Sequence, residues 1–380
     1  MTQQPSHRGP FGFERPFYWS LQKLEILEKY AQAAAPILAR NHRVTFVDLM
    51  AGEARYESGE LGSTGHFARI ASANAAVGRS IRCIAYETNP AAFAKLEANT
   101  ADVRQLVDVR NARWEEDVPA LLRDIQGDFA FFFVDPMGLR EISWSALDPL
   151  LTRPSSEILV NFASPIAARL VGKWRRGAPT ATGDKNRLDA VFGGESWVSV
   201  VSPYQTTSGE LLQSLAQHYA DRVAAVGQYG VASQTIRQGG ASGKPKYHLI
   251  FGSRNELAFV LLSGIIAGQT ERLKIEALQA STRIPEGQIA MVLDVESPEQ
   301  VAGRLLVEEL ANSLVHDPEL LGRPMTLTQL YREAIDSRFG EYRRALYRAA
   351  VFDKLDPEGR VIIHDRKRSQ WGSVIEIPRR

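Results

Sequence analysis

The sequence predicts an α/β protein: a mostly parallel sheet that ends in an antiparallel hairpin, followed by a small, basic α+β domain. Three observations carry this prediction. Short apolar runs alternate with helix-like stretches through roughly the first 160 residues. These runs are continuously hydrophobic, as in parallel strands that are buried on both faces. Beyond about residue 320 the chain becomes basic and the pattern changes.

The alternating region begins with a helix. From Trp19 to about Arg40, apolar side chains recur at helical spacing, which predicts an amphipathic helix. The strand-like runs that follow are Val44–Leu49, Ile81–Glu87, Leu106–Arg110, Phe129–Asp135 and Glu157–Phe162. The helix-like stretches between them are Gly65–Ala76, Ala91–Asn99, Val118–Asp124 and Ser145–Leu151.

Two further strands are expected after a long, poorly patterned segment at about 170–207. A helix at Gly209–Tyr219 precedes apolar runs at Val231–Arg237 and Tyr247–Gly252, and the glycine-rich linker between these runs favours a hairpin. Five parallel strands closed by an antiparallel hairpin form the seven-stranded, Rossmann-like sheet of class I methyltransferases. A dehydrogenase would usually continue with more parallel βα units.

The last 60 residues predict a winged-helix-like domain, because two helices precede a two-stranded hairpin. The helical patterns are Leu327–Ile335 and Glu341–Lys354, and the strand-like runs are Arg360–His364 and Val374–Ile377. Residues 321–380 contain thirteen Lys and Arg against eight Asp and Glu, although the whole chain has a net charge of only +1. The expected parts are a methyltransferase-like domain over 1–280, a helical connector over 281–320 and the basic domain over 321–380.

Composition excludes several classes of protein. The single cysteine, Cys83, excludes a disulfide framework and a Cys-rich metal site, and it suits the reducing cytosol. The seven histidines are scattered, so no metal site is expected. No secretory signal pattern is present, and the longest apolar stretch, Leu257–Ala267, is shorter than the ~20 residues that span a bilayer. We therefore expect a cytoplasmic protein without a membrane partner.

The turn after the first strand predicts a cofactor site. Asp48 ends that strand, and Ala51 and Gly52 follow where the backbone can approach a ligand in the crevice of an open α/β sheet. A carboxylate here would repel a pyrophosphate but favours the ammonium group of a methionine moiety. The dinucleotide fingerprint GxGxxG and the phosphate loop GxxxxGK[ST] are both absent. The pattern favours S-adenosylmethionine, although Asp48 alone is equally well explained as a turn or capping acid.

Two more strand ends fit the same cofactor. Glu87 ends the second strand, where an acid can accept both hydrogen bonds of an adenosine ribose. Near the end of the third strand, Asn111 could contact the adenine amine and Trp114 could stack on a base. Taken singly, Glu87 is explained as a solvated acid at a strand end, and Trp114 as core.

The fourth strand ends in Asp135 and Pro136, the predicted catalytic pair. Proline after a strand-end aspartate fixes the turn and directs the carboxylate into the crevice. In amine methyltransferases, (D/N)PP(Y/F) binds the target amine at this position. Met137 and Gly138 replace the second proline and the aromatic residue, so the sequence does not supply the side chain that stacks on a base in that motif.

Together these segments resemble the bacterial three-Cys-motif partner (TcmP) family over roughly residues 11–265. The segments are Trp19 and Lys23–Tyr30, Val47–Ser63, Phe133–Gly138, Glu157–Phe162 and Tyr247–Gly252. The resemblance implies a Rossmann-like methyltransferase fold and a genomic association with a protein that carries three cysteines, but no substrate. The matching site positions are Asp48, Gly52, Glu87, Asp135 and Pro136. The chain departs from the family at Ala54, where a second glycine is usual, and at 163–166 after Phe162.

We expect methyl transfer to a nucleic acid or nucleoprotein, with an exocyclic amine or an oxygen as acceptor. Cytosine C5 chemistry is excluded, because Cys83 lies inside a strand and away from the crevice. The predicted phosphate contacts are Arg343, Arg344, Arg348, Arg366, Lys367 and Arg368, which lie on one helix and on the wing. The alternatives are an ordinary solvated basic face, a non-catalytic partner subunit that binds the cofactor or nucleic acid, and small-molecule methylation, which leaves the basic domain without a role.

Overall fold

The structure, a computed structural model, describes residues 15–204, 208–238, 243–281 and 297–379. Its contacts divide the chain into two compact units, Met1–Ala258 and Phe259–Arg380. The division lies nearer the N-terminus than the boundary expected at residue 280. Within the described residues, none of the helices combines the length and the apolar character needed to cross a membrane.

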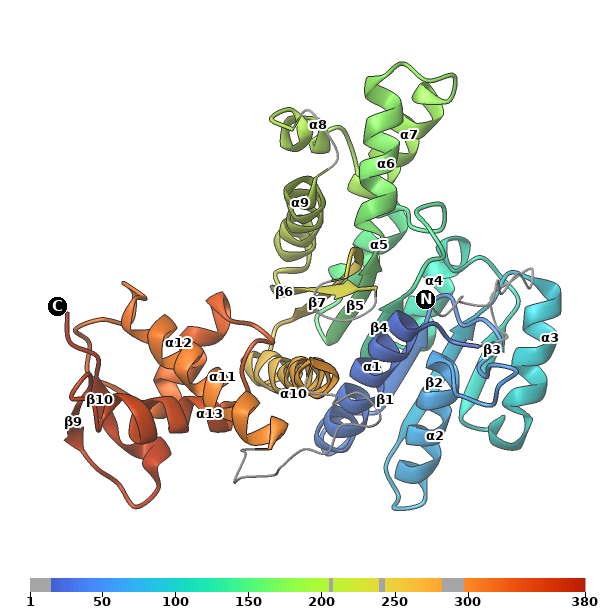
Figure 1. The fold of residues 1–380 in the computed structure, drawn as a ribbon. Coiled ribbons are helices and arrows are strands. Elements are labelled where there is room, and N and C mark those ends of the chain that lie inside the picture. The colour runs from blue at the N-terminus through green and yellow to red at the C-terminus, as the bar shows by residue number, and fades with distance from the viewer. Residues whose placement is uncertain (1–14, 205–207, 239–242, 282–296, 380) are drawn as a thin grey trace, which may run out of the picture. The chain divides into compact units, whose positions relative to one another are not determined.

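The first unit contains a seven-stranded sheet in the order β3-β2-β1-β4-β5-β7-β6 (Figure 1). The first five strands pair in parallel, and β7 pairs antiparallel with both β5 and β6. The strands are β1 (Val44–Asp48), β2 (Ile81–Tyr86), β3 (Val107–Arg110), β4 (Phe129–Val134), β5 (Ser156–Phe162), β6 (Gly230–Arg237) and β7 (Pro245–Ser253). This is the class I methyltransferase arrangement, so the predicted fold class is confirmed.

The strand register brings the predicted site segments to one edge of the sheet. Asp48 at the end of β1 pairs with Ala85 on β2 and with Phe133 on β4. Because β1, β2, β4 and β5 are parallel, the turns that follow them all emerge at the carboxyl edge. Glu87 and Asp135, each directly beyond its strand, therefore lie near the turn that follows Asp48.

Helices cover both faces of this sheet. On one face, Phe46, Phe131 and Phe133 pack against Phe67 of α2 and Tyr30 of α1. On the other face, alternate strand residues such as Val47 and Phe132 join the core formed with α4, α5, α6 and α9. The helices of the parallel half are α1 (Tyr18–Leu38), α2 (Ser63–Ala75), α3 (Pro90–Asn99), α4 (Trp114–Asp124) and α5 (Trp144–Leu151), with a short 3-10 turn, η1 (Ala101–Val103).

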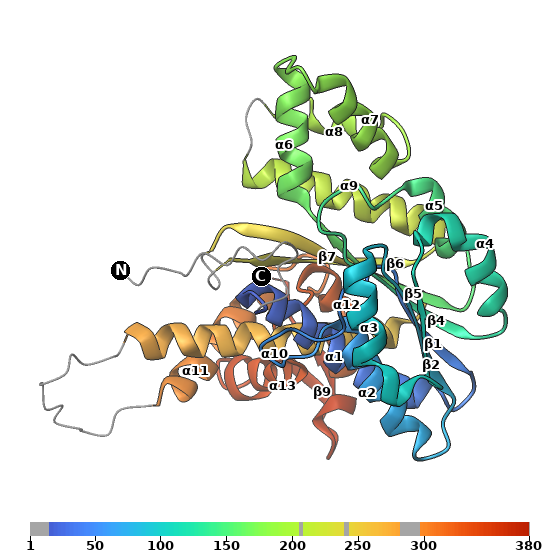
Figure 2. The ribbon, with the colours of Figure 1, turned by 90° about the vertical axis from the view of Figure 1, so that its right-hand side faces the viewer.

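A helical insertion separates β5 from β6. It consists of α6 (Ser164–Arg175), α7 (Ala181–Phe192), α8 (Trp197–Val201) and α9 (Gly209–Gly227). Figures 1 and 2 show α6 and α7 side by side and extending away from the sheet. The sequence pattern at about 170–207 is poor because these helices bury few residues each, mainly Leu188, Val191 and Phe192 on α7 and Trp197 and Val201 on α8.

The second unit contains more elements than the sequence predicted. Its helices are α10 (Glu256–Ser281, from Phe259 onward), α11 (Pro298–Val315), α12 (Leu327–Ser337) and α13 (Arg344–Ala349), the last continued by a π-helical turn, η2 (Ala350–Leu355). The strands β8 (Met325–Thr326), β9 (Ile362–Asp365) and β10 (Val374–Glu376) form an antiparallel sheet in the order β8-β10-β9, with η3 (Gln370–Gly372) between the last two.

Helix α11 lies in the segment for which a connector was expected. Its Leu306, Leu310 and Leu314 are buried in the core of the second unit, together with residues of α12 and η2. Since a linker buries little apolar surface, α11 belongs to the second unit rather than joining two domains.

Candidate functional site

A cleft of about 760 Å³ opens at the carboxyl edge of the sheet, within the range typical of ligand sites. Of the predicted site residues, Ala51, Gly52, Glu87, Asp135 and Pro136 line it. Asp48 and Asn111 are not among the lining residues. The loops after β1, β2 and β4 therefore meet at the carboxyl edge of the sheet, where we predicted the ligand site.

The loop after β1 is tied to β2 by hydrogen bonds that use Glu87. The Ala51 N–H donates to the Tyr86 carbonyl oxygen at 2.8 Å, and the Gly52 N–H donates to Glu87 Oε2 at 3.0 Å. Glu87 Oε1 accepts from the Asn89 N–H at 2.7 Å. Both carboxylate oxygens are thus fixed by backbone donors at the cleft, and each retains further accepting capacity.

The same loop contains two left-handed positions that are separated by one residue. Gly52 has φ +61°, and Ala54, where the resembled family has glycine, also has φ +61°. An alanine in this region costs about 1–2 kcal/mol relative to right-handed backbone. A Cβ on Gly65 would lie 2.4 Å from the Ala54 carbonyl oxygen, so the start of α2 and this loop approach closely. Ala54 therefore holds this loop in a strained backbone conformation.

Asp48 is fully buried behind this loop. Its Oδ2 accepts from the Thr64 hydroxyl at 2.7 Å, and its Oδ1 accepts from the Met50 N–H at 3.4 Å. Burial raises the pKa of the Asp48 carboxyl from 3.8 to about 6, although hydrogen bonds from Ser63 and Thr64 lower it. In this geometry Asp48 fixes the turn and the start of α2, and it does not reach the cleft surface.

The predicted adenine contacts are arranged differently from expectation. The Asn111 side-chain amide donates to the Glu87 carbonyl oxygen at 2.8 Å, so it braces the end of β2. Trp114 lines the cleft but is only 2% exposed and belongs to the core. Its indole N–H donates to the Glu141 carbonyl oxygen at 3.3 Å.

Asp135 lies in a polar cluster that the sequence predicted only in part. Its Oδ2 accepts from Lys23 of α1, and its Oδ1 accepts from the Asn161 amide nitrogen at 2.6 Å. Asn161 is the penultimate residue of β5 and is 6% exposed, yet its Oδ1 has no hydrogen-bond partner. All three residues line the cleft, and the unpartnered Asn161 Oδ1 is itself enclosed by protein atoms.

Lys23 and Asn161 were missed by the sequence analysis. Lys23 shares its face of α1 with the buried residues Leu27, Tyr30 and Ala34, at spacings of four, three and four residues. A cation on the apolar face of an amphipathic helix needs a buried partner. The position of Lys23 on that face could therefore have identified it as a site residue. Asn161 was visible as a polar residue at the end of a continuous apolar strand.

Aromatic side chains flank this cluster and the mouth of the cleft. Lys23 Nζ lies 6.0 Å from the Phe133 ring centre and 5.8 Å from that of Tyr247. Burial and the Asp135 charge together raise the pKa of Tyr56 to about 12. Phe17 and Trp19 are stacked at 4.5 Å between ring centres, and both line the cleft.

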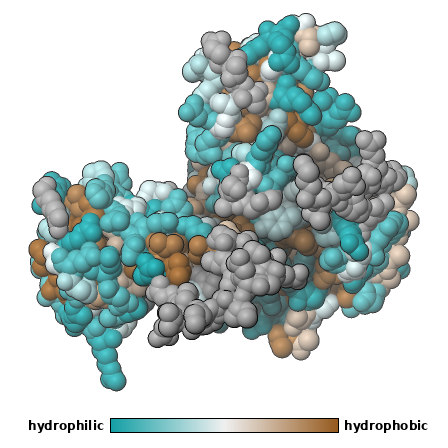
Figure 3. Space-filling view, viewed as in Figure 1, coloured by the Kyte–Doolittle hydropathy of each residue, from teal (hydrophilic) through white to brown (hydrophobic). Residues whose placement is uncertain are grey.

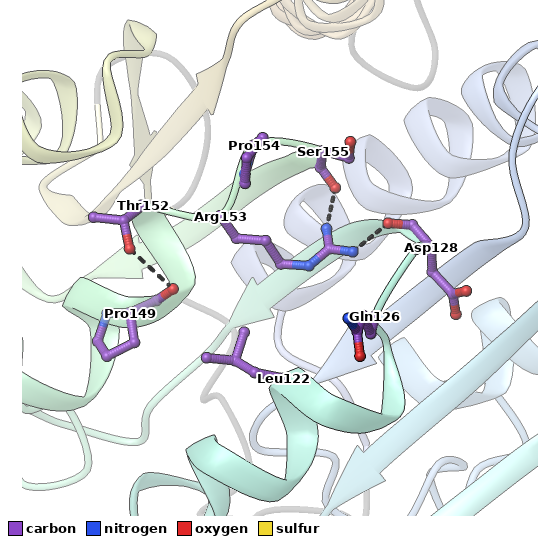
Figure 4. A pocket seen from close by; sticks show the side chains of 9 residues that line it. Leu122, Gln126, Asp128, Pro149, Thr152, Arg153, Pro154 and Ser155 are labelled. Atoms are coloured by element: carbon purple, nitrogen blue, oxygen red, sulfur yellow. Dashed lines mark hydrogen bonds between the residues drawn. The ribbon is translucent and has the colours of Figure 1, made fainter.

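A second depression, of about 420 Å³, lies at the amino ends of β4 and β5 (Figure 4). The Arg153 side chain spans it and donates to the carbonyl oxygens of Ile125 at 2.8 Å, Asp128 and Ser155. The guanidinium group therefore satisfies the ends of the surrounding turns. Because ligands of open α/β sheets bind at the opposite, carboxyl edge, we assign this depression no role.

Most of the predicted phosphate contacts in the second unit already have partners. Arg343 pairs with Glu271, Arg348 with Asp353, Arg366 with Asp356 and Lys367 with Asp365. The Arg344 guanidinium lies 4.1 Å from the Trp371 ring centre. Arg368 is exposed, and no carboxylate contacts it within the described part of the chain.

The charge of the whole second unit is also balanced. From Phe259 to Arg380 the sequence has seventeen Lys and Arg against eighteen Asp and Glu. The excess of cations over 321–380 is offset by the acids of α10, α11 and the segment between them.

We compared the chain with protein families, curated proteins and solved structures. No family model matches the chain, and no curated protein matches its sequence. Among solved structures, the chain is similar to the small RNA methyltransferase HEN1 with 9% identity and a TM-score of 0.35, over 67% of this chain. The aligned part covers 28% of the HEN1 chain, well under half of its length.

For two other solved structures, the aligned part makes up more of their own chains. The O-methyltransferase TomG from Streptomyces achromogenes, in complex with SAM, is 14% identical over 61% of this chain and 80% of TomG, with a TM-score of 0.36. A putative rRNA methylase from Clostridium thermocellum is 12% identical over 62% of this chain and 96% of its own, with a TM-score of 0.31. The assignment of the fold rests on the strand order, which does not depend on these similarities.

Proposed function

We propose that this protein is an S-adenosylmethionine-dependent methyltransferase that acts on a nucleic acid or nucleoprotein. The observation that carries the proposal is the cleft at the carboxyl edge of the sheet, where Glu87 and Asp135 lie on either side of the Gly52 turn. The cofactor supplies a reactive methyl sulfonium, so the protein has chiefly to place an acceptor in line with it.

The residues around Gly52 fit the cofactor. The Glu87 carboxylate, held by two backbone N–H groups, can accept further hydrogen bonds from ribose hydroxyls. The left-handed Gly52 leaves the backbone open to close approach by a ligand. Asp48 supports the turn from behind, so we assign it a positioning role in place of the expected contact with the methionine ammonium.

The cluster of Lys23, Asp135 and Asn161 fits an acceptor group that donates a hydrogen bond. The Asn161 amide donates to Asp135 Oδ1 and so fixes the carboxylate at the cleft. An amine or hydroxyl in the cleft can donate its hydrogen to the Asp135 carboxylate, which can take the proton. Lys23 would then stabilise negative charge that develops on an oxygen. Pro136, which is buried, fixes the turn that presents Asp135.

The architecture of the second unit supports a nucleic acid as the acceptor. The second unit has the order helix, strand, helix, helix and hairpin, with a sheet ordered β8-β10-β9, and this supports the winged-helix-like interpretation. The resemblance to the TcmP family, with its three-cysteine protein partner, rests on the sequence segments alone. A partner subunit without catalysis remains the alternative, and the strained Ala54 is the feature that favours it.

Calorimetry with S-adenosylhomocysteine tests the first half of the proposal, and transfer of a labelled methyl group tests the second. The purified protein should bind the cofactor product and should label total RNA or genomic DNA, with the modified nucleoside found after digestion. Absence of cofactor binding would refute the methyltransferase assignment. Binding without any transfer, to RNA, DNA or co-purified nucleic acid, would favour the partner-subunit alternative.

A further inference from the structure

Helix α6 begins at the cleft, and three cations lie along one side of this helix and of its C-terminal cap. Arg169 lines the cleft, and Lys173 and Arg176 follow at spacings of four and three residues. Residues at these spacings lie on one side of a helix, and seven residues extend about 10 Å along its axis. Figures 1 and 2 show α6 leading away from the sheet, and the surface over α6 and α7 is largely hydrophilic (Figure 3). We call Arg169, Lys173 and Arg176 the α6 ridge.

The α6 ridge is not neutralised by acids. Among the described residues, none of its three cations has a carboxylate within ion-pair distance. The chain from Glu157 to Asp184 contains four cations and no acid between those two positions. The fourth cation, Arg175, donates instead to the carbonyl oxygens of Val201 and Tyr204. The ridge therefore presents uncompensated positive charge beside the candidate active site.

The ridge is also held in place. The Ser164 hydroxyl, at the start of α6, contacts His248 Nδ1 of β7 at 2.7 Å, and His248 Nε2 contacts Gln213 of α9 at 3.1 Å. Burial lowers the pKa of His248 to about 4, so this ring is neutral at pH 7. On its inner side α6 buries Leu170 and Val171. Cations on such a rigid element lose less conformational freedom on binding than cations on a mobile loop.

The aromatic pair at the cleft mouth lies next to the start of the ridge. Phe162 pairs with His248 across the antiparallel strands β5 and β7, so Lys246, two residues before His248, lies near the start of α6. Lys246 Nζ is 5.0 Å from the Trp19 ring centre, and the Tyr247 hydroxyl donates to the Trp19 carbonyl oxygen at 2.5 Å. An aromatic stack with a cation beside it is a surface on which a nucleobase can stack.

We propose that the α6 ridge and the Phe17–Trp19 stack form a track for single-stranded nucleic acid, with phosphates along the ridge and a base against the stack. The inference rests on the proposed function and names its substrate class. A basic groove combined with aromatic platforms is the pattern by which proteins bind single strands. Bases in a duplex are paired and stacked, so they cannot use the platform unless they are flipped out.

The experiment compares two triple variants of the full-length protein that remove equal charge. The first, R169Q/K173Q/R176Q, removes the ridge. The second, R40Q/R79Q/R104Q, removes three exposed arginines that precede β1, β2 and β3 at the opposite edge of the sheet. Fluorescence anisotropy measures the affinity for a labelled RNA of about twelve nucleotides, and for its duplex, over a range of salt concentrations.

The wild type should bind the single strand more tightly than the duplex. Loss of three phosphate contacts should reduce the slope of log K against log salt by about 2 for the ridge variant, since each contact contributes about 0.7 on single strands. The opposite-edge variant should keep the wild-type slope. Equal slopes in all three proteins, or equal losses in both variants, would overturn the track.

The stack is tested separately by F17A, which changes a side chain that is 43% exposed, and by W19A. Each should weaken single-strand binding by about 5- to 150-fold, the range for one stacked base, and leave the salt slope unchanged. Unchanged affinity in both variants would overturn the stacking half of the proposal.

Cofactor binding separates failure of the track from failure of the proposed function. Lys173 and Arg176 lie outside the cleft lining, so K173Q/R176Q should bind S-adenosylhomocysteine as the wild type does. A wild type that binds this cofactor product but no oligonucleotide at low salt would refute the track and leave a methyltransferase with another acceptor. A wild type that binds RNA through the ridge but no cofactor would refute the methyltransferase assignment and leave the track.

Discussion

Two basic regions of this chain differ in what surrounds their cations. The predicted nucleic-acid surface of the second unit includes Arg343 and Arg348, and both pair with carboxylates of that unit. The α6 ridge of the first unit is shorter and was not predicted, yet its cations have no acidic partner among the described residues. Charge counted along a sequence includes cations that the fold neutralises. Only the charge left after pairing attracts a polyanion over distance.

We propose that chemistry and acceptor binding both lie in the first unit, and the predictions below test this proposal. The largest expected effect is on turnover. Asp135→Asn should reduce methyl transfer by about 100-fold or more, the usual contribution of a positioned acid or base, and should leave S-adenosylhomocysteine affinity nearly unchanged. Transfer from labelled cofactor and calorimetry measure the two quantities. Full activity of the variant would show that Asp135 is not catalytic and serves only to form the turn.

The second prediction concerns Asp48 and stability. Its pKa is raised from 3.8 to about 6 in the folded protein, so the folded state favours the neutral acid. Its stabilising contribution is complete below pH 4 and is lost as pH rises through about 6. A shift of this size corresponds to about 3 kcal/mol.

Asp48→Asn lacks this titration, so the two proteins should differ in their dependence on pH. The free energy of unfolding of the wild type should fall relative to that of the variant between pH 4 and pH 6, and the difference should stay constant above pH 7. Urea unfolding at a series of pH values measures it. Parallel profiles would show that Asp48 is solvated in the folded protein.

The third prediction concerns the cofactor. Glu87→Ala removes the acceptor that lines the cleft and should weaken S-adenosylhomocysteine binding by about 1–3 kcal/mol, as for hydrogen bonds to a charged group. Glu97→Ala, which removes an exposed acid of α3 outside the cleft, is the matched control and should have no effect. Equal affinities in the wild type and Glu87→Ala would refute the ribose contact.

Strands β1, β4 and β5 could be predicted because each is a largely apolar, buried run that is followed by polar or turn-forming residues. The placement of the strand ends at one sheet edge then predicted Glu87 and Asp135 as neighbours. The pair of Lys23 and Asp135 could not be predicted, because 112 residues separate the two and no local periodicity encodes such a contact. The sequence also did not reveal that Asp48 is enclosed by the start of α2, since burial depends on tertiary packing.

In the second unit, the sequence predicted the helices but not which cations are neutralised. Helix α12 begins at the predicted Leu327 and ends two residues beyond Ile335, and α13 lies inside the predicted range Glu341–Lys354, because their apolar faces are periodic. The partner of Arg343 is Glu271 on α10, 72 residues earlier and outside the segment whose charge was counted. An acid at that distance in the sequence does not enter a local count, although it cancels the charge in the fold.

The smallest expected effect comes from R343Q/R344Q/R348Q in the second unit. If all three arginines contacted phosphates, as the sequence predicts, their loss would lower the salt slope by about 2 on single strands and nearly 3 on duplex DNA. In the structure Arg343 and Arg348 are paired with Glu271 and Asp353, and only Arg344, stacked on Trp371, has no carboxylate among its described contacts.

We therefore expect the slope to fall by one contact or less, about 0.7 to 0.9, and single-strand affinity at low salt to stay close to the wild-type value. Anisotropy under the conditions used for the α6 ridge measures both. A fall of 2 or more would mean that phosphates displace the carboxylates, which surface ion pairs permit because they contribute little to stability. In that case the second unit would bind nucleic acid as the sequence predicted. If the salt slope fell only for duplex DNA, the two regions would bind different substrates. The α6 ridge would contact the single strand, and the second unit would contact a neighbouring duplex.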